Sequence, residues 1–129
     1  MTGGALLAQM VALELGCHFS YSERTVTDGL VRYALPPAQR SSVRGMRLAL
    51  VDDVINAGSA TGGTHAAVVA SGGIPVGIGA LLVLGDAIDH LAADWGLPVV
   101  ALERRTSHLW TADVCPLCAA GVPLEQLPD

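Results

Sequence analysis

The chain has 129 residues, of which 51% are hydrophobic and 15% charged, and its formal net charge is −5. This length suits a single domain covering residues 1–129, the apolar content excludes a disordered chain, and the negative charge disfavours nucleic acid as a partner. The apolar stretches are too short to span a membrane and the N-terminus lacks the basic region of a secretory signal, so we expect a cytoplasmic globular protein that binds no membrane.

The first part of the chain predicts a helix, a strand and an irregular region. Residues 5–15 are apolar almost all round and are followed by Gly16, a pattern expected of a helix buried against a sheet. Residues 19–23 form a short strand candidate. In residues 24–45, the pair Asp28-Gly29 predicts either a hairpin turn or a mobile loop.

The rest of the chain alternates between strands and helices. Residues 47–51 form an apolar run that ends in two acids, as expected of a parallel strand buried on both faces. In chain order, the later patterns predict a helix at 61–71, a strand at 74–84, a helix at 86–95 and a strand at 98–102. This alternation predicts an α/β fold with an open parallel sheet flanked by helices.

The segment LALVDDVINAGSAT, residues 48–61, carries the strongest chemical signal. Ligands of open parallel sheets bind outside the carboxyl ends of the strands, where Asp52 and Asp53 are predicted to lie. Two adjacent carboxylates suit a vicinal diol of ribose or a hydrated magnesium ion beside it. The following small residues open a helix, whose free N–H groups and dipole attract phosphate. The predicted phosphate-binding residues are Asn56, Ala57, Gly58, Ser59, Ala60 and Thr61.

Other interpretations of this segment remain open. A strand, an acidic turn and a helix cap occur in the same order in proteins that bind no ligand. Dinucleotide and triphosphate binding fit less well, because the chain has no GxGxxG after a strand and no GxxxxGK[ST] motif.

A pair of cysteines stands near the C-terminus. Cys115 and Cys118 form a CPLC motif, which in other proteins indicates zinc or redox chemistry. A zinc site needs about four ligands, and the sequence has no second CxxC and only scattered histidines. We therefore favour structural packing for these cysteines.

The segment VDDVINAGSAT resembles the phosphoribosyl-pyrophosphate (PRPP) loop of type I phosphoribosyltransferases, in which an apolar strand, two acids and a short phosphate loop follow one another. Thr2-Gly3-Gly4 is similar to the pyrophosphate loop of the orotate members. CPLCAAGVPL is similar to a C-terminal signature of some bacterial members. The resemblance covers nearly the whole chain and implies a type I phosphoribosyltransferase-like, Rossmann-like core.

The resemblance also implies a function. The expected reaction transfers ribose 5-phosphate from PRPP to a nucleobase, by resemblance orotate, in pyrimidine nucleotide synthesis. It implies that Asp52 and Asp53 are catalytic and hold the ribose hydroxyls, that residues 56–60 hold the 5-phosphate, and that Thr2, Gly3 and Gly4 meet the pyrophosphate. Mg²⁺ would arrive with PRPP rather than on protein side chains, and the protein would be a homodimer.

The chain also departs from the family pattern. The mobile loop of the orotate enzymes is rich in lysine and arginine, whereas this chain has no lysine, so Arg24 and Arg32 are the candidates for pyrophosphate contacts. Arginines in polar loops are also often simply solvated. By this resemblance, we expect the chain to begin inside the pyrophosphate loop and to lack the N-terminal hood over the base. Two hypotheses follow, an orotate-like transferase and a non-catalytic module that binds PRPP or another sugar phosphate.

Overall fold

The computed structural model describes residues 3–108, 110–111 and 113–123. Strands β3, β4 and β5 form a parallel sheet in that order, and β1 and β2 form an antiparallel hairpin. The predicted α/β fold with an open parallel sheet is therefore confirmed. The elements in chain order are α1 (Gly3–Leu15), β1 (Glu23–Thr27), β2 (Leu30–Ala34), α2 (Pro37–Arg40), β3 (Arg47–Ile55), α3 (Ser59–Ala70), β4 (Ile74–Leu84), α4 (Ala87–Trp95), β5 (Val99–Arg105) and α5 (Pro116–Ala119).

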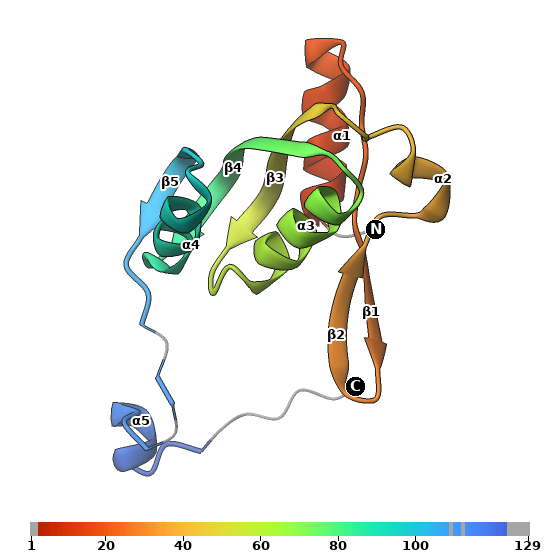
Figure 1. The fold of residues 1–129 in the computed structure, drawn as a ribbon. Helices are drawn as coiled ribbons and strands as arrows, with labels where there is room; N and C mark the ends of the chain where they lie inside the picture. The colour runs from red at the N-terminus through yellow and green to blue at the C-terminus, as the bar shows by residue number, and fades with distance from the viewer. Residues whose placement is uncertain (1–2, 109, 112, 124–129) are drawn as a thin grey trace.

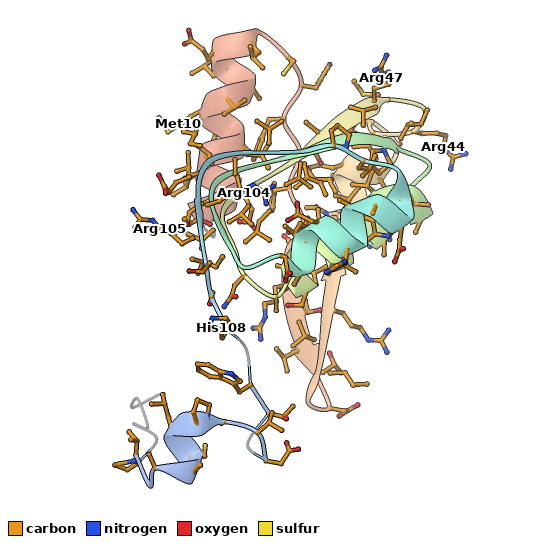
Figure 2. All side chains as sticks on the ribbon, turned by 90° about the vertical axis from the view of Figure 1, so that its left-hand side faces the viewer. Met10, Arg44, Arg47, Arg104, Arg105 and His108 are labelled. Atoms are coloured by element: carbon orange, nitrogen blue, oxygen red, sulfur yellow. The ribbon has the colours of Figure 1, made fainter. Side chains whose placement is uncertain are left out.

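The sheet has helices on both sides. Figure 1 shows α3 and α4 in front of the sheet and α1 behind it, and the turned view of Figure 2 places α1 and α4 on opposite sides. The main core lies between the sheet and the front helices, where Ile55, Val83 and Ile88 are at most 2% exposed. Burying side chains of this size contributes about 1.5–3 kcal/mol each, so this layer holds β3, β4 and α4 together.

The rear of the molecule is much less buried than the sequence predicts. In α1 only Gly4 and Ala12 are buried, while Met10 is 68% and Leu13 is 83% exposed. The predicted helix is present and packs against the sheet, but only one of its sides is covered, because the apolar residues of its other side face outward. On the open part of the same sheet face, Leu102 of β5 is 80% exposed.

The hairpin of β1 and β2 confirms the turn signal in the sequence. Asp28 and Gly29 both have positive φ, 53° and 73°, as a two-residue type I′ turn requires. The predicted strand at 19–23 is wrong, since β1 begins at Glu23 and residues 17–22 pair with no strand. Side chains hold this segment instead, for example through the 2.7 Å hydrogen bond from Ser20 Oγ to Gln39 Oε1.

The strand β3 differs from its prediction in length and burial. It continues four residues beyond Val51, to Ile55, and the described part of the chain gives it a single strand neighbour, β4. Only Leu50 and Ile55 are buried in it, so the prediction of burial on both faces is wrong. Its position at the edge of the sheet explains the exposure.

No helix in the described residues is both long enough and apolar enough to span a membrane.

Candidate functional site

Two adjacent carboxylates lie in the second half of β3. The backbone N–H of Asp53 donates a hydrogen bond to Asp52 Oδ1 at 3.0 Å, so the two residues are held together locally. Burial, and after it the neighbouring Asp53 carboxyl, together raise the pKa of Asp52 to about 6, although the hydrogen bond from the Asp53 N–H acts in the opposite direction. A ligand that supplies hydroxyl donors or positive charge stabilises the ionised form of such a partly buried carboxyl group.

The N-terminus of α1 lies against this carboxylate pair. A Cβ built at Gly3 would overlap the Asp53 carboxylate, and one built at Gly4 would overlap that of Asp52. Glycine at both positions therefore permits the approach. The first N–H groups of a helix have no partner within it, so this end of α1 offers donors and a positive dipole beside the acids. Thr2, the third predicted member of this loop, lies outside the described residues.

The predicted phosphate loop connects β3 to α3. Gly58 has φ 76°, a backbone conformation that favours glycine, and a Cβ there would also displace the end of the Leu91 side chain, whose Cδ1 would lie 2.8 Å away. No side chain caps α3, which leaves its first N–H groups available. Asn56, Ala57 and Ser59 are exposed. Such an end can bind an anion.

Thr61, in the first turn of α3, carries a further donor. The residue is 5% exposed, and its Oγ1 has no hydrogen-bond partner among the described residues. A buried hydroxyl without a partner costs free energy, and most buried polar atoms in folded proteins have one. A bound phosphate at the end of α3 would supply an acceptor.

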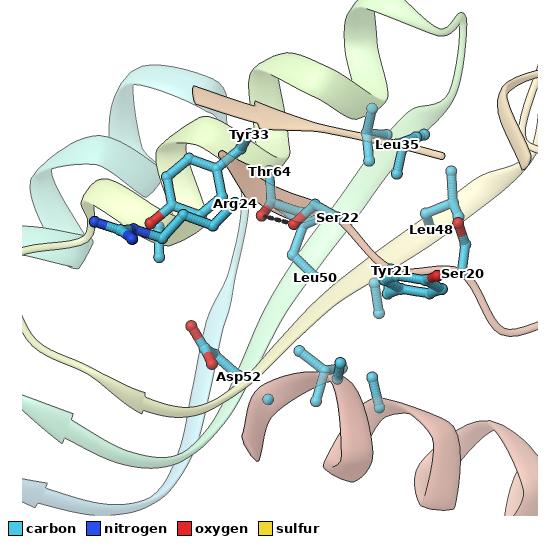
Figure 3. Close-up of a pocket in the computed structure, with 17 residues that line it drawn as sticks. Ser20, Tyr21, Ser22, Arg24, Tyr33, Leu35, Leu48, Leu50, Asp52 and Thr64 are labelled. Atoms are coloured by element: carbon cyan, nitrogen blue, oxygen red, sulfur yellow. Dashed lines mark hydrogen bonds between the residues drawn. The ribbon is translucent and has the colours of Figure 1, made fainter. Parts of the chain in front are cut away.

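A cavity of about 190 Å³ lies between the start of α1, β3, α3 and the hairpin. It brings together four residues that the sequence predicts in the site: Gly4, Arg24, Asp52 and Ala60. Figure 3 shows Asp52 on one side of this cavity and Arg24 on the other. Its apolar walls include Leu35, Leu48, Leu50 and Val68.

A larger groove, of about 720 Å³, runs between the hairpin and α3. Both predicted arginines line it, together with Ser59 of the phosphate loop. In the hairpin, Arg24 lies opposite Tyr33 and Arg32 lies opposite Thr25, so the two arginines leave opposite faces of the ribbon. Arg24 therefore reaches both cavities, whereas Arg32 lines only the groove.

The sequence interpretation missed five polar residues of the cavity, namely Ser20, Tyr21, Ser22, Tyr33 and Thr64. Ser22 Oγ and Thr64 Oγ1 lie 2.7 Å apart and join the hairpin entrance to α3 (Figure 3). Tyr33 could have been found from the hairpin turn, because the Asp28-Gly29 register places it opposite Arg24. Six predicted residues that the structure describes line neither cavity, namely Gly3, Asp53, Asn56, Ala57, Gly58 and Thr61.

The structure contradicts the packing interpretation of the CPLC motif. Cys118 is exposed and Cys115 is only partly buried, so neither thiol belongs to the core. Among the described residues, no three His, Cys, Asp or Glu side chains are grouped as a metal site would require.

No protein-family model matches the chain. The chain is similar to the orotate phosphoribosyltransferase of Thermus thermophilus, with 33% identity over 126 residues that cover 97% of this chain and 64% of the relative. It is also 26% identical to the orotate phosphoribosyltransferase of Caldanaerobacter subterraneus, over 95% of this chain and 60% of that protein. The chain thus spans somewhat less than two thirds of the length of these relatives.

Solved structures resemble the chain in fold. The adenine phosphoribosyltransferase of Thermoanaerobacter pseudethanolicus superposes with a TM-score of 0.63 and 20% identity, covering 81% of this chain and 66% of that one. The adenine phosphoribosyltransferase of Leishmania tarentolae gives a TM-score of 0.59 and 19% identity, with 81% and 62% covered. At such identities the likeness concerns the fold and leaves the accepted base open.

Proposed function

We propose that this chain, which belongs to the type I phosphoribosyltransferase family and has its fold, transfers ribose 5-phosphate from PRPP to a nucleobase. One observation carries the proposal. The free N-terminus of α1 lies against the adjacent carboxylates Asp52 and Asp53, and Ala60 at the start of α3 lines one cavity together with Gly4 and Asp52. Two anion-binding ends and a diol-binding pair match a sugar with phosphates at both ends.

The proposed arrangement of PRPP follows from these groups. The pyrophosphate lies at the start of α1, near Gly3 and Gly4, with Arg24 on the hairpin as its cation. The ribose hydroxyls donate to Asp52 and Asp53. The 5-phosphate accepts hydrogen bonds from the N–H groups of residues 57–61 and from the buried hydroxyl of Thr61.

The reaction forms a bond from a base nitrogen to the anomeric carbon and breaks the bond from that carbon to pyrophosphate. Positive charge develops on the ribose, and the carboxylates of Asp52 and Asp53 stabilise it electrostatically. The carboxylate oxygens of this pair could also accept hydrogen bonds from the water molecules of a hydrated Mg²⁺ ion. When bound with PRPP, Mg²⁺ neutralises charge on the departing pyrophosphate.

We propose orotate as the base, which places the reaction in pyrimidine nucleotide biosynthesis in the cytoplasm. The support is the similarity to two orotate phosphoribosyltransferases over nearly the whole of this chain. The fold is shared with adenine enzymes, so the choice of base depends on sequence similarity alone.

A non-catalytic module that binds PRPP is the second candidate. The observation in its favour is the small number of cations, since Arg24 is the one basic residue among the described residues that line the smaller cavity. Such a site can bind a sugar phosphate through helix ends and glycine, yet it provides little charge to stabilise departing pyrophosphate.

We also propose that the protein is a homodimer that covers the rear surface. Leu6, Met10 and Leu13 are 50%, 68% and 83% exposed, and their spacing of four and three residues places them on one stripe of α1. Exposed apolar patches of this kind mark interfaces. Sedimentation should give a dimer that Met10→Glu dissociates; a monomeric wild-type chain would contradict the proposal.

Isothermal titration with PRPP and Mg²⁺, followed by orotate in the same cell, tests the function. Binding should disappear in the variant Asp52→Asn/Asp53→Asn and persist in Asp94→Asn, which changes an exposed aspartate of α4 that lines neither cavity. Release of pyrophosphate upon addition of orotate supports the transferase. Binding without turnover with orotate or purines supports the binding module, and absence of binding rejects both.

A further inference from the structure

The CPLC motif forms a separate feature outside the proposed PRPP site. Cys115 immediately precedes α5 and Cys118 is the third residue of this short helix. Figure 1 shows α5 standing apart from the sheet, beyond the segment that follows β5. Both cysteines are free thiols, one exposed and one partly buried. Both can therefore react with small molecules from solution.

The first turn of α5 brings Cys115 and Cys118 close together. The backbone N–H of Cys118 donates a hydrogen bond to Cys115 Sγ over 3.4 Å. This distance places Cys115 Sγ within about 5 Å of the Cα of Cys118, because N and Cα are separated by one bond. Residues three apart on a helical turn are also neighbours at the distance that a disulfide spans. We expect that a rotation of the Cys118 side chain brings its sulfur to Cys115 Sγ.

The environment of the two thiols differs. The hydrogen bond from the Cys118 N–H lowers the pKa of the Cys115 thiol, because it favours the thiolate. Thiolates rather than thiols attack disulfides. Cys115 is therefore the cysteine that attacks first, and the exposed Cys118 is in position to attack in the second step.

We propose that Cys115 and Cys118 form a redox-active dithiol that exchanges with the disulfides of low-molecular-weight thiols. The Cys115 thiolate attacks one sulfur of the small disulfide, which forms a mixed disulfide and releases one small thiolate. Cys118 then loses its proton and attacks Cys115 Sγ, which forms the Cys115–Cys118 disulfide and releases the second small thiolate. The protein is oxidised by two electrons and the small disulfide is reduced to two thiols.

The arrangement favours this dithiol over a zinc site within one chain. Structural zinc takes about four ligands. Around the pair, the part of the chain that the structure describes contributes no third His, Cys, Asp or Glu to a cluster. A pair of thiols on one turn is by itself sufficient for disulfide exchange.

The test equilibrates the full chain with glutathione and glutathione disulfide at defined ratios, blocks free thiols by alkylation, and locates them by peptide mass spectrometry. We expect the peptide that contains residues 115–118 to lose both thiols and to gain an internal disulfide. The matched control is Cys17→Ser, which removes the other exposed cysteine and should leave this oxidation unchanged.

Single variants separate the roles of the two cysteines. With Cys118→Ser or Cys115→Ser, the remaining thiol should stop at the mixed disulfide with glutathione, and the Cys118→Ser chain should react faster because it keeps the Cys115 thiolate. The proposal is overturned if both thiols survive the most oxidising buffer, if the disulfide joins two chains, or if stoichiometric zinc protects the pair.

Discussion

Gly4 of α1 lies so close to Asp52 of β3 that a side chain at position 4 would overlap the carboxylate. The contact joins the end of a helix to the middle of a strand that is distant in sequence. It also places the free N–H groups of α1 beside the acids, which is the geometry that the proposed binding of pyrophosphate and ribose requires.

The first prediction concerns this contact. Gly4→Ala should lower the free energy of unfolding by about 1–3 kcal/mol, because the added methyl group displaces α1 or the carboxylate, and it should weaken PRPP binding. The matched control is Gly62→Ala within α3, where the new Cβ would meet Trp95 at an ordinary 3.8 Å. That variant should gain about 0.5–1 kcal/mol from helix propensity. Urea unfolding measures both, and a fully stable Gly4→Ala protein would disprove the contact.

The second prediction concerns pH. Burial raises the pKa of Asp52 from 3.8 to about 6, so the folded protein holds this proton more tightly than the unfolded chain does. The resulting stability is complete below about pH 4 and is lost as the pH rises through about 6. The shift corresponds to at most about 3 kcal/mol, which solvent screening of this half-buried group reduces to about 2 kcal/mol. Asp52→Asn should remove it, whereas Asp94→Asn should keep it.

PRPP binding should show the opposite dependence on pH. Ribose hydroxyls donate to the ionised carboxylate, so affinity should increase as Asp52 loses its proton near pH 6. Titrations at pH 5 and pH 8, with the second ionisation of the phosphates taken into account, measure the difference. If PRPP affinity changed equally between pH 5 and pH 8 in the wild type and in Asp52→Asn, Asp52 would not contact the ligand.

The third prediction separates stability from binding at Thr61. Thr61→Val should raise the free energy of unfolding by about 1 kcal/mol, because it removes a buried hydroxyl that has no partner among the described residues. The same variant should bind PRPP roughly threefold to tenfold more weakly, since a hydrogen bond to phosphate is lost. Thermal unfolding with and without PRPP measures both effects. A variant that is less stable but binds normally would refute the phosphate assignment.

The fourth prediction concerns the arginine of the hairpin. Arg24→Gln should weaken PRPP binding by roughly tenfold or more, the expected effect of losing a charge-assisted hydrogen bond. Arg32→Gln should have a smaller effect, because Arg32 lines only the outer groove. The control is Arg47→Gln, an exposed arginine at the start of β3 that lines neither cavity. If all three variants lose affinity equally, the cause is net charge rather than a specific contact.

Much of the fold could be predicted from the sequence because its signals are local. The apolar run at 74–84 matches β4 at both ends, and Asp28-Gly29 forms the tight turn that its residues favour. The small residues of 56–61 also predict their own position, since a strand followed by a helix leaves them at the carboxyl end of the sheet, whereas Asp52 and Asp53 lie within β3 and not beyond its end.

Tertiary structure decided what depends on distant partners. The approach of α1 to Asp52 and the hydrogen bond between Ser22 and Thr64 both join segments far apart in the chain. Burial is decided in the same way. An apolar pattern shows that a face can be buried, but the neighbouring elements determine whether it is, and for this reason α1, β3 and the CPLC cysteines are more exposed than their sequences predict.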